Sequence, residues 1–195
     1  MSLEEIDTFF RKNPGFNWID LTGGEIFLRK DIHEILRTIV SYCKNLYLLH
    51  FPTNGSCYKE IIRAIDFLMD SPVPLIIVTI SIDGDEETHN RIRGKENAFK
   101  FAKKAFLELK KRTNKKFKVY AGMTISRFNI KRIHEILRKM EDEIPGLTYN
   151  DMHLNFAQSS SHFYQNDSDV LIDPAEQIEV FRELSDRTRN ECRGI

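Results

Sequence analysis

The chain has no excess of charge of either sign and no long apolar run. Lysine plus arginine and aspartate plus glutamate each number 29, so the formal net charge is zero. This balance gives no electrostatic reason to expect nucleic acid or an anionic membrane as a partner. The longest apolar run, around Leu75–Ile80, has the length of a strand, whereas roughly 20 residues are needed to span a bilayer. We therefore expect an ordinary globular protein.

Cysteine is also scarce. Cys43, Cys57 and Cys192 are odd in number and widely scattered. Their spacing fits neither a disulfide framework nor a compact metal-binding knuckle. We therefore expect reduced thiols, a cytoplasmic location and no metal site within this chain.

Three common catalytic signatures are incomplete or missing. His33-Glu34 and His134-Glu135 each begin an HExxH zinc motif, but an arginine stands where the second histidine is required. We therefore expect both histidines to be helix-surface residues. Neither the GxxxxGK[ST] phosphate loop nor the GxSxG nucleophile elbow occurs. These absences leave no catalytic residue to assign within the chain.

Short apolar runs alternate with amphipathic segments along the whole chain. The apolar runs have the length and composition of strands buried on both faces, as in a parallel sheet. The strands that we predict are Asn17–Leu21, Leu46–Phe51, Leu75–Ile82, Lys118–Ile125 and His153–Ala157.

Apolar residues at helical spacing separate these runs and predict helices. Helices are expected around Ile32–Val40, Tyr58–Leu68, Ala98–Leu109 and Ile133–Met140, with others over Ser2–Lys12 and from Pro174 onward. Asn129 is a candidate N-cap. The pattern predicts a single α/β domain over residues 1–195, with an open, mostly parallel sheet of about five strands and flanking helices. It leaves open whether this is a partial (β/α) barrel or a flat doubly wound sheet.

Short polar residues and glycines follow the predicted strands. In such folds, ligands gather at the carboxyl ends of the strands, where loops and helix N-termini meet. The segments at these ends are Thr22-Gly23-Gly24-Glu25, Thr53-Asn54-Gly55, Ser81-Ile82-Asp83-Gly84, Thr124-Ile125-Ser126 and Gln158-Ser159-Ser160-Ser161. Paired glycines admit a ligand close to the backbone, and a following carboxylate can accept hydrogen bonds from an ammonium group. Taken singly, Gly23-Gly24, Asn54-Gly55 and Asp83-Gly84 are better explained as simple strand-to-helix turns.

Taken in order, these segments resemble the core of radical S-adenosylmethionine (SAM) enzymes. Gly23-Gly24-Glu25 resembles the GGE segment of that family, and Thr53-Asn54-Gly55 its next strand end. Ser81-Ile82-Asp83-Gly84, with His89 and Arg93-Gly94 downstream, resembles its SxDG segment. The likeness runs from about Asn17 to Asn129, with Ile26 where the family usually has proline. It implies an incomplete six-stranded (β/α) barrel.

The resemblance also implies roles for individual residues. Gly23, Gly24 and Glu25 would contact the methionyl ammonium of SAM, and Ser81 and Asp83 its carboxylate or ribose. Thr124 and Ser126 would lie near the ribose, Asn54 is a further candidate, and Arg93 would either pair with the carboxylate or tie its loop to the barrel. On the substrate side, the segment after the fifth strand offers Gln158, Ser160, His162 and Tyr164.

The family signature CxxxCxxC, whose three thiolates hold a 4Fe–4S cluster, is absent here. The chain opens on a helix, so we expect it to be truncated at the N-terminus, or at both ends, and inactive alone. The resemblance implies a full-length iron–sulfur oxidoreductase that reductively cleaves SAM to a 5′-deoxyadenosyl radical for hydrogen abstraction. Its partners would be a small-molecule or peptide substrate and an electron donor for the cluster, with neither nucleic acid nor membrane involved.

Two alternatives remain open from the residues. One is a cluster-free, non-catalytic module that binds a nucleotide or a partner. The other is a phosphate-binding barrel enzyme that uses Gly23-Gly24 as its anion site.

Overall fold

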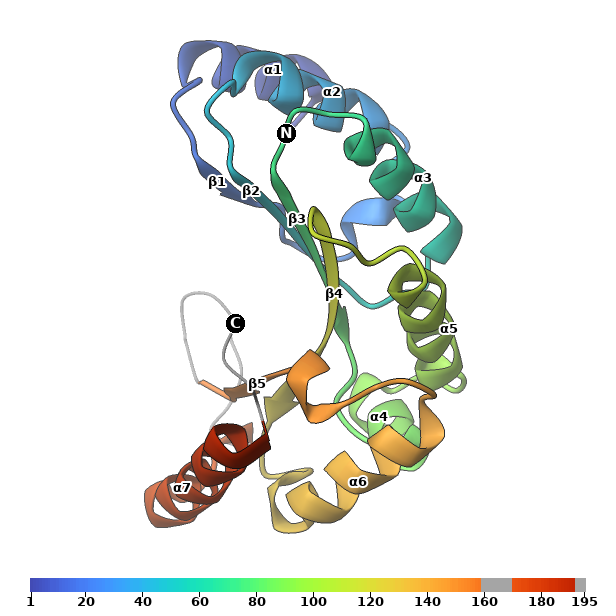
Figure 1. Cartoon of the computed structure of the whole chain (residues 1–195), viewed down its shortest axis with the longest axis vertical. Helices are drawn as coiled ribbons and strands as arrows, with labels where there is room; N and C mark the ends of the chain where they lie inside the picture. The colour runs from blue at the N-terminus through green and yellow to red at the C-terminus, as the bar shows by residue number, and fades with distance from the viewer. Residues whose placement is uncertain (159–169, 192–195) are drawn as a thin grey trace. The chain divides into compact units, whose positions relative to one another are not determined.

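A computed structural model describes residues 1–158 and 170–191 of the chain. Strands and helices alternate along these residues (Figure 1). The described strands are β1 (Trp18–Asp20), β2 (Leu48–Thr53), β3 (Leu75–Ser81), β4 (Phe117–Ile125) and β5 (Met152–Phe156). The helices are α1 (Leu3–Lys12), α2 (Ile32–Tyr42), α3 (Tyr58–Met69), α4 (Glu86–Arg93), α5 (Ala98–Lys110), α6 (Ile133–Glu143) and α7 (Pro174–Glu191). Short 3-10 turns cover η1 (Ile26–Leu28), η2 (Ile130–Arg132) and η3 (Tyr149–Asp151).

All the predicted strands are present, with ends that differ from the prediction by at most two residues, and so are the predicted helices. Helix α4 was not predicted, because its eight residues are mostly polar and carry no apolar stripe. Its ends are nevertheless encoded locally. The carboxylate of Asp85 accepts a hydrogen bond from the backbone N–H of Thr88, and Gly94 ends the helix in the left-handed conformation, with φ of 60°.

The strands pair in the same order as they occur in the chain, β1-β2-β3-β4-β5. Asp20 pairs with His50 and Phe51 with Val78 in parallel registers, and β4 and β5 are likewise parallel. In a doubly wound sheet the strand order reverses at a switch point, whereas in a (β/α) barrel it advances one strand at a time. The observed order therefore favours the barrel alternative.

The chain forms two compact units, each described by itself. The first unit comprises Met1–Ser81 and Phe101–Tyr120, and the second comprises Ile82–Lys100 and Ala121–Ile195. No helix among the described residues is both long enough and apolar enough to cross a membrane.

The first unit has a core between one face of its strands and the helices that cover it. Helices α2 and α3 lie on one side of β1, β2 and β3 (Figure 1). Leu49 and Phe51 of β2 and Ile76 and Val78 of β3 point to this side and are fully buried. The residues between them are only half-buried. The expectation of strands buried on both faces is therefore wrong for β2 and β3, whose second face is open.

The core of the second unit includes apolar residues of α6 and β4. Ile136, Leu137 and Met140 of α6 are buried, as are Met123 and Ile125 of β4. The 3.6-residue spacing on α6 and the alternation on β4 thus both mark the buried side.

Gly55 provides a test of the packing in the first unit. Its φ of +76° is strained for other residues, and a Cβ atom there would lie 3.0 Å from both the Cα of Ala102 and the Cβ of Ala105. We expect Gly55→Ala to lower the free energy of unfolding by about 2–4 kcal/mol in urea titrations. Gly15→Ala, where a Cβ would meet nothing within 4 Å, is the matched control. Equal stability of the two variants would contradict this packing.

Candidate functional site

Gly23 and Gly24 form an exposed turn after β1. A Cβ atom built on either glycine would meet nothing within 4 Å. The peptide groups of this turn are therefore open to a ligand from the carboxyl edge of the strands. Glycine at position 23 also allows the observed φ of +147°.

The carboxylate of Glu25 is held next to this turn by neutral hydrogen-bond donors. The Thr53 hydroxyl lies 2.8 Å from each carboxylate oxygen, and the backbone N–H of Asn54 donates to Oε2 at 2.7 Å. The backbone N–H of Phe27 donates to Oε1 at 3.3 Å. These contacts fix the carboxylate between the ends of β1 and β2 without neutralising its charge.

The sequence-predicted residues of the first unit share one edge of its sheet. Asn54 follows β2, and its side-chain Oδ1 accepts a hydrogen bond from the backbone N–H of Ser56 at 2.8 Å. Ser81 is the last residue of β3 and is half-buried. Because β1, β2 and β3 are parallel neighbours, their carboxyl ends bring Gly24, Asn54 and Ser81 to the same edge. Thr53, which was not among the predicted SAM contacts, is the buried residue that anchors Glu25.

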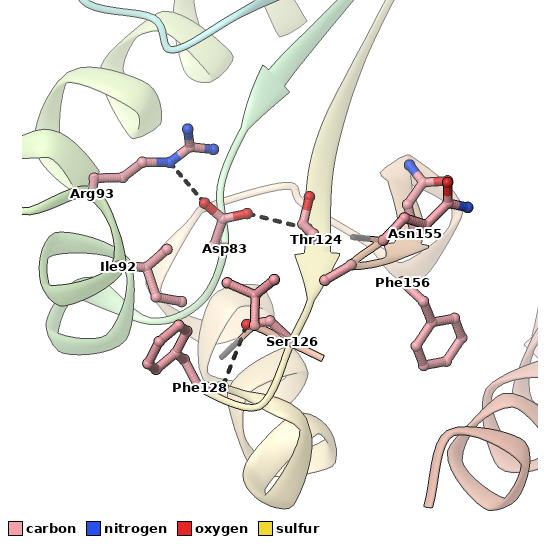
Figure 2. A pocket seen from close by; sticks show the side chains of 11 residues that line it. Asp83, Ile92, Arg93, Thr124, Ser126, Phe128, Asn155 and Phe156 are labelled. Carbon is pink, nitrogen blue, oxygen red and sulfur yellow. Dashed lines mark hydrogen bonds and ion pairs between the residues drawn. The ribbon is translucent and has the colours of Figure 1, made fainter. Parts of the chain in front are cut away.

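In the second unit, the buried carboxylate of Asp83 lies at the centre of a polar network. Its side chain is only 4% exposed. The Arg93 Nε atom lies 2.7 Å from Oδ2, and the backbone N–H of Thr124 donates to Oδ1 at 3.1 Å (Figure 2). Burying a carboxylate is costly unless it is paired and hydrogen-bonded. Asp83 therefore ties α4 to the end of β4, with Arg93 as its counter-ion.

His89 completes this network as a neutral ring. The backbone N–H of Asp83 donates to Nδ1 of His89 at 3.0 Å, so the neutral ring carries its proton on Nε2. The side chain is 2% exposed. Burial lowers the pKa of His89 to about 4, with Asp83 opposing and Arg93 assisting this shift.

Asn129 is a site residue that the sequence suggested only as a helix cap. It stands at the N-cap of η2, but its buried side chain makes other contacts. Nδ2 donates to the backbone carbonyls of Asp83 and Thr124, each at 3.0 Å, and Oδ1 accepts from the backbone N–H of Ser126 at 2.8 Å. Its amide therefore holds the Asp83 and Thr124–Ser126 segments together. The sequence signal that could have indicated this role was an asparagine three residues after Ser126.

A cavity of about 600 Å³ opens beside this network. It combines charged and hydroxyl groups with apolar walls, as Figure 2 shows for Phe128 and Phe156. Such a lining offers apolar surface to a ligand together with a few polar groups that can orient it. The lining residues are Asp83, Ile92, Arg93, Thr124, Ser126, Phe128, Asn155, Phe156, Ala157, Gln158 and Val170.

The structure thus brings Asp83, Arg93, Thr124, Ser126 and Gln158 to one cavity. Three other residues predicted for the substrate side, Ser160, His162 and Tyr164, lie outside the described residues.

The described residues contain no cluster of three or more histidine, cysteine or acidic side chains that could hold a metal ion. Cys43 is buried at the end of α2, and Cys57 is the N-cap of α3. Burial raises the pKa of the Cys43 thiol, which disfavours the thiolate that binds iron. Cys192 lies outside the part of the chain that is described.

The neutral state of His89 predicts a pH dependence of stability. The pKa of the ring is about 4 in the folded chain and 6.5 as its ordinary value, so the unfolded chain binds more protons between these limits. The stabilisation is therefore complete above pH 6.5 and is lost as the pH falls toward 4, by up to about 3 kcal/mol. Urea unfolding across this range measures it.

His89→Gln should flatten this dependence, because the titrating ring is gone. His134→Gln, which changes an exposed histidine of α6, should retain the wild-type slope. An unchanged slope in His89→Gln would show that the ring is not the titrating group.

The chain is similar to two curated proteins of Bacillus subtilis (strain 168), and no family model matches it. It is 28% identical over 121 residues to the sporulation killing factor maturation protein SkfB, covering 62% of the chain and 27% of that protein. It is 28% identical over 124 residues to the antilisterial bacteriocin subtilosin biosynthesis protein AlbA, covering 63% and 26%. The chain thus spans about a quarter of the length of these relatives.

Two solved structures of anSMEcpe share its fold. Native anSMEcpe with bound AdoMet and Kp18Cys peptide superimposes with a TM-score of 0.67 at 17% identity, over 98% of this chain and 52% of that one. Native anSMEcpe with bound AdoMet gives 0.65 at 16% identity, over 97% and 51%. The predicted partial (β/α) barrel class is thereby confirmed. Together with the ordered strand-end motifs, these similarities support a relationship between the chain and the radical SAM superfamily.

Proposed function

We propose that the chain is the SAM-binding part of an iron–sulfur radical SAM enzyme that modifies a peptide. The observation that carries this proposal is the carboxylate of Glu25. It is held by a hydroxyl and two peptide N–H groups, all neutral, beside the open turn of Gly23 and Gly24. A preorganised carboxylate whose charge is not neutralised, next to exposed peptide groups, fits an ammonium group. The methionyl end of SAM carries such a group.

The residues of the second unit, taken by themselves, fit a nucleoside. The cavity beside Asp83 has hydroxyl groups from Thr124 and Ser126 and an aromatic wall from Phe128. Asp83 itself is buried and engaged by Arg93 and Thr124. We therefore assign Asp83 the role of positioning the cavity wall, and Ser126 and Thr124 the role of contacting the ribose.

The chain's own residues bind and orient SAM in this proposal. When bound, SAM supplies the hydrogen-abstracting chemistry that the resemblance implies. The two cysteines among the described residues, Cys43 and Cys57, do not fit a 4Fe–4S cluster, because they stand at the ends of separate helices and Cys43 is buried. We therefore infer that the chain alone is an inactive fragment and that the cluster ligands belong to the rest of the protein.

A peptide substrate and a cytoplasmic location complete the proposal. The relatives are a maturation protein and a bacteriocin biosynthesis protein, and one structural neighbour has a bound peptide. Gln158 lines the cavity, and we propose that it faces the substrate. An electron donor would be the further partner of the whole enzyme.

The phosphate-binding alternative is disfavoured by the same carboxylate. A phosphate at Gly23-Gly24 would lie next to Glu25, whose like charge repels it. A non-catalytic binding module would have the same fold as the proposed enzyme. The two are therefore distinguished by experiments on cofactor binding and cleavage.

The Glu25 carboxylate should determine SAM affinity. We expect Glu25→Gln to weaken SAM binding roughly ten- to a hundred-fold in titration calorimetry, because a charge-assisted hydrogen bond contributes about 1.5–3 kcal/mol. Affinity for 5′-methylthioadenosine, which lacks the amino-acid moiety, should be unchanged. Glu34→Gln, at an exposed position of α2, is the matched control. Wild-type SAM affinity in Glu25→Gln would remove this residue from the site, and competition by inorganic phosphate would favour the anion-site alternative.

The isolated chain should not assemble a cluster. After anaerobic incubation with iron and sulfide, we expect its iron and sulfide content to equal that of a variant in which Cys43, Cys57 and Cys192 are all serine. With SAM and a reductant, neither protein should release 5′-deoxyadenosine above background. A longer form of the protein that carries a CxxxCxxC segment is the positive control. Stoichiometric, cysteine-dependent iron in the present chain would overturn the assignment of the ligands to another part of the protein.

A further inference from the structure

Three polar side chains form a row across the open face of the first unit, apart from the SAM motifs. Asp20 ends β1, His50 lies within β2 and Thr79 within β3. The Nδ1 atom of His50 is 3.1 Å from Oδ2 of Asp20, and its Nε2 atom is 2.8 Å from Oγ1 of Thr79. The imidazole thus connects a carboxylate on one side to a hydroxyl on the other.

The parallel register places these three side chains on the same face. Asp20 pairs directly with His50, and Thr79 pairs with Pro52, two residues beyond His50. Residues two apart on a strand point to the same side, so all three lie opposite the face covered by α2 and α3. The side chain of His50 is 21% exposed and that of Asp20 45% exposed. A ligand can therefore reach the row from the open face.

The donors and acceptors in the row have a definite direction. An ionised carboxylate only accepts, so Nδ1 of His50 carries a proton and donates it to Asp20. In the neutral ring Nε2 is then an acceptor, and the hydroxyl of Thr79 donates to it. This leaves the oxygen of Thr79 able to accept a hydrogen bond from a ligand.

We propose that Thr79, His50 and Asp20 form a proton relay that serves a ligand bound on this face. A hydroxyl, thiol or ammonium group of the ligand donates to Oγ1 of Thr79 and loses its proton to it, while the Thr79 proton moves to Nε2 of His50. Loss of the proton lowers the charge of the ligand by one unit, and the charge of His50 rises by one unit. Asp20 stabilises the resulting imidazolium. His50 is the proton acceptor, and Asp20 is a positioning residue.

Trp18 indicates the kind of ligand that this face accepts. It lies two residues before Asp20 on β1, on the same face, and is 62% exposed. An exposed indole offers a flat surface for apolar or cationic groups. A peptide segment with a donor side chain matches an aromatic surface next to a polar row. The relay does not depend on SAM binding, but under the proposed function its ligand would be the peptide substrate.

The first test measures the protonation state of His50 in the wild-type chain. Long-range ¹H–¹⁵N correlation spectra of the imidazole rings at neutral pH identify which nitrogen carries the proton, and His50→Gln assigns the signal. We expect the Nδ1–H form, and a change to the Nε2–H form in Asp20→Ala. Glu60→Ala, which removes the carboxylate beside His33, should leave the His50 signal unchanged. A wild-type ring with its proton on Nε2, a ring protonated on both nitrogens, or no change in Asp20→Ala would overturn the relay.

The second test measures the reactivity of Nε2 independently of any cofactor. Diethyl pyrocarbonate acylates unprotonated imidazole nitrogens, and mass spectrometry of peptides quantifies His50 against His134 as an internal reference. Thr79→Val removes the donor that occupies Nε2 and should raise the rate at His50 severalfold, whereas Thr79→Ser should restore the wild-type rate. Asp20→Ala should lower the rate. Equal rates at His50 in the wild type and Thr79→Val would overturn the proposal, whether or not the chain binds SAM.

Discussion

The arrangement of the second unit depends on one buried carboxylate, that of Asp83, whose charge must be compensated. Asp83 is almost inaccessible to water, and a charge in that position is tolerated only with a counter-ion and hydrogen-bond donors. Arg93 supplies the charge and the backbone of Thr124 supplies a donor. His89 is kept neutral beside them, and Asn129 ties the two backbone segments together. The position of the cavity wall follows from these contacts.

Glu25 in the first unit contrasts with Asp83 because its partners are neutral. Thr53 and the peptide N–H groups of Phe27 and Asn54 orient the carboxylate without cancelling its charge. A carboxylate with a cationic partner mainly stabilises a fold, whereas one held by neutral donors keeps its attraction for a cationic ligand. This difference explains why we assign Asp83 to positioning and Glu25 to binding, although the two stand in similar places at strand ends.

The open face of the first unit adds a separate chemical feature to this arrangement. Helices cover one side of β2 and β3, and the alternation of the strands directs His50 and Thr79 to the other side. Thr53, only three residues beyond His50, points to the covered side and holds Glu25. Strand β2 therefore contributes Thr53 to the carboxyl edge and His50 to the open face. The two side chains have separate roles because successive residues of a strand point to opposite faces.

The sequence by itself determined the order of the strands and helices and the polar residues that end each strand. Apolar periodicity and strand-end glycines are local signals, and they led to Glu25 and Asp83. The tertiary structure decided what those residues contact. The amide of Asn129 meets the carbonyl of Asp83 across 46 residues of chain, and His50 meets Thr79 across 29. Such contacts depend on strand order, register and the path of the loops, which only the folded chain establishes, because local patterns specify which face a residue takes and not which partner it meets.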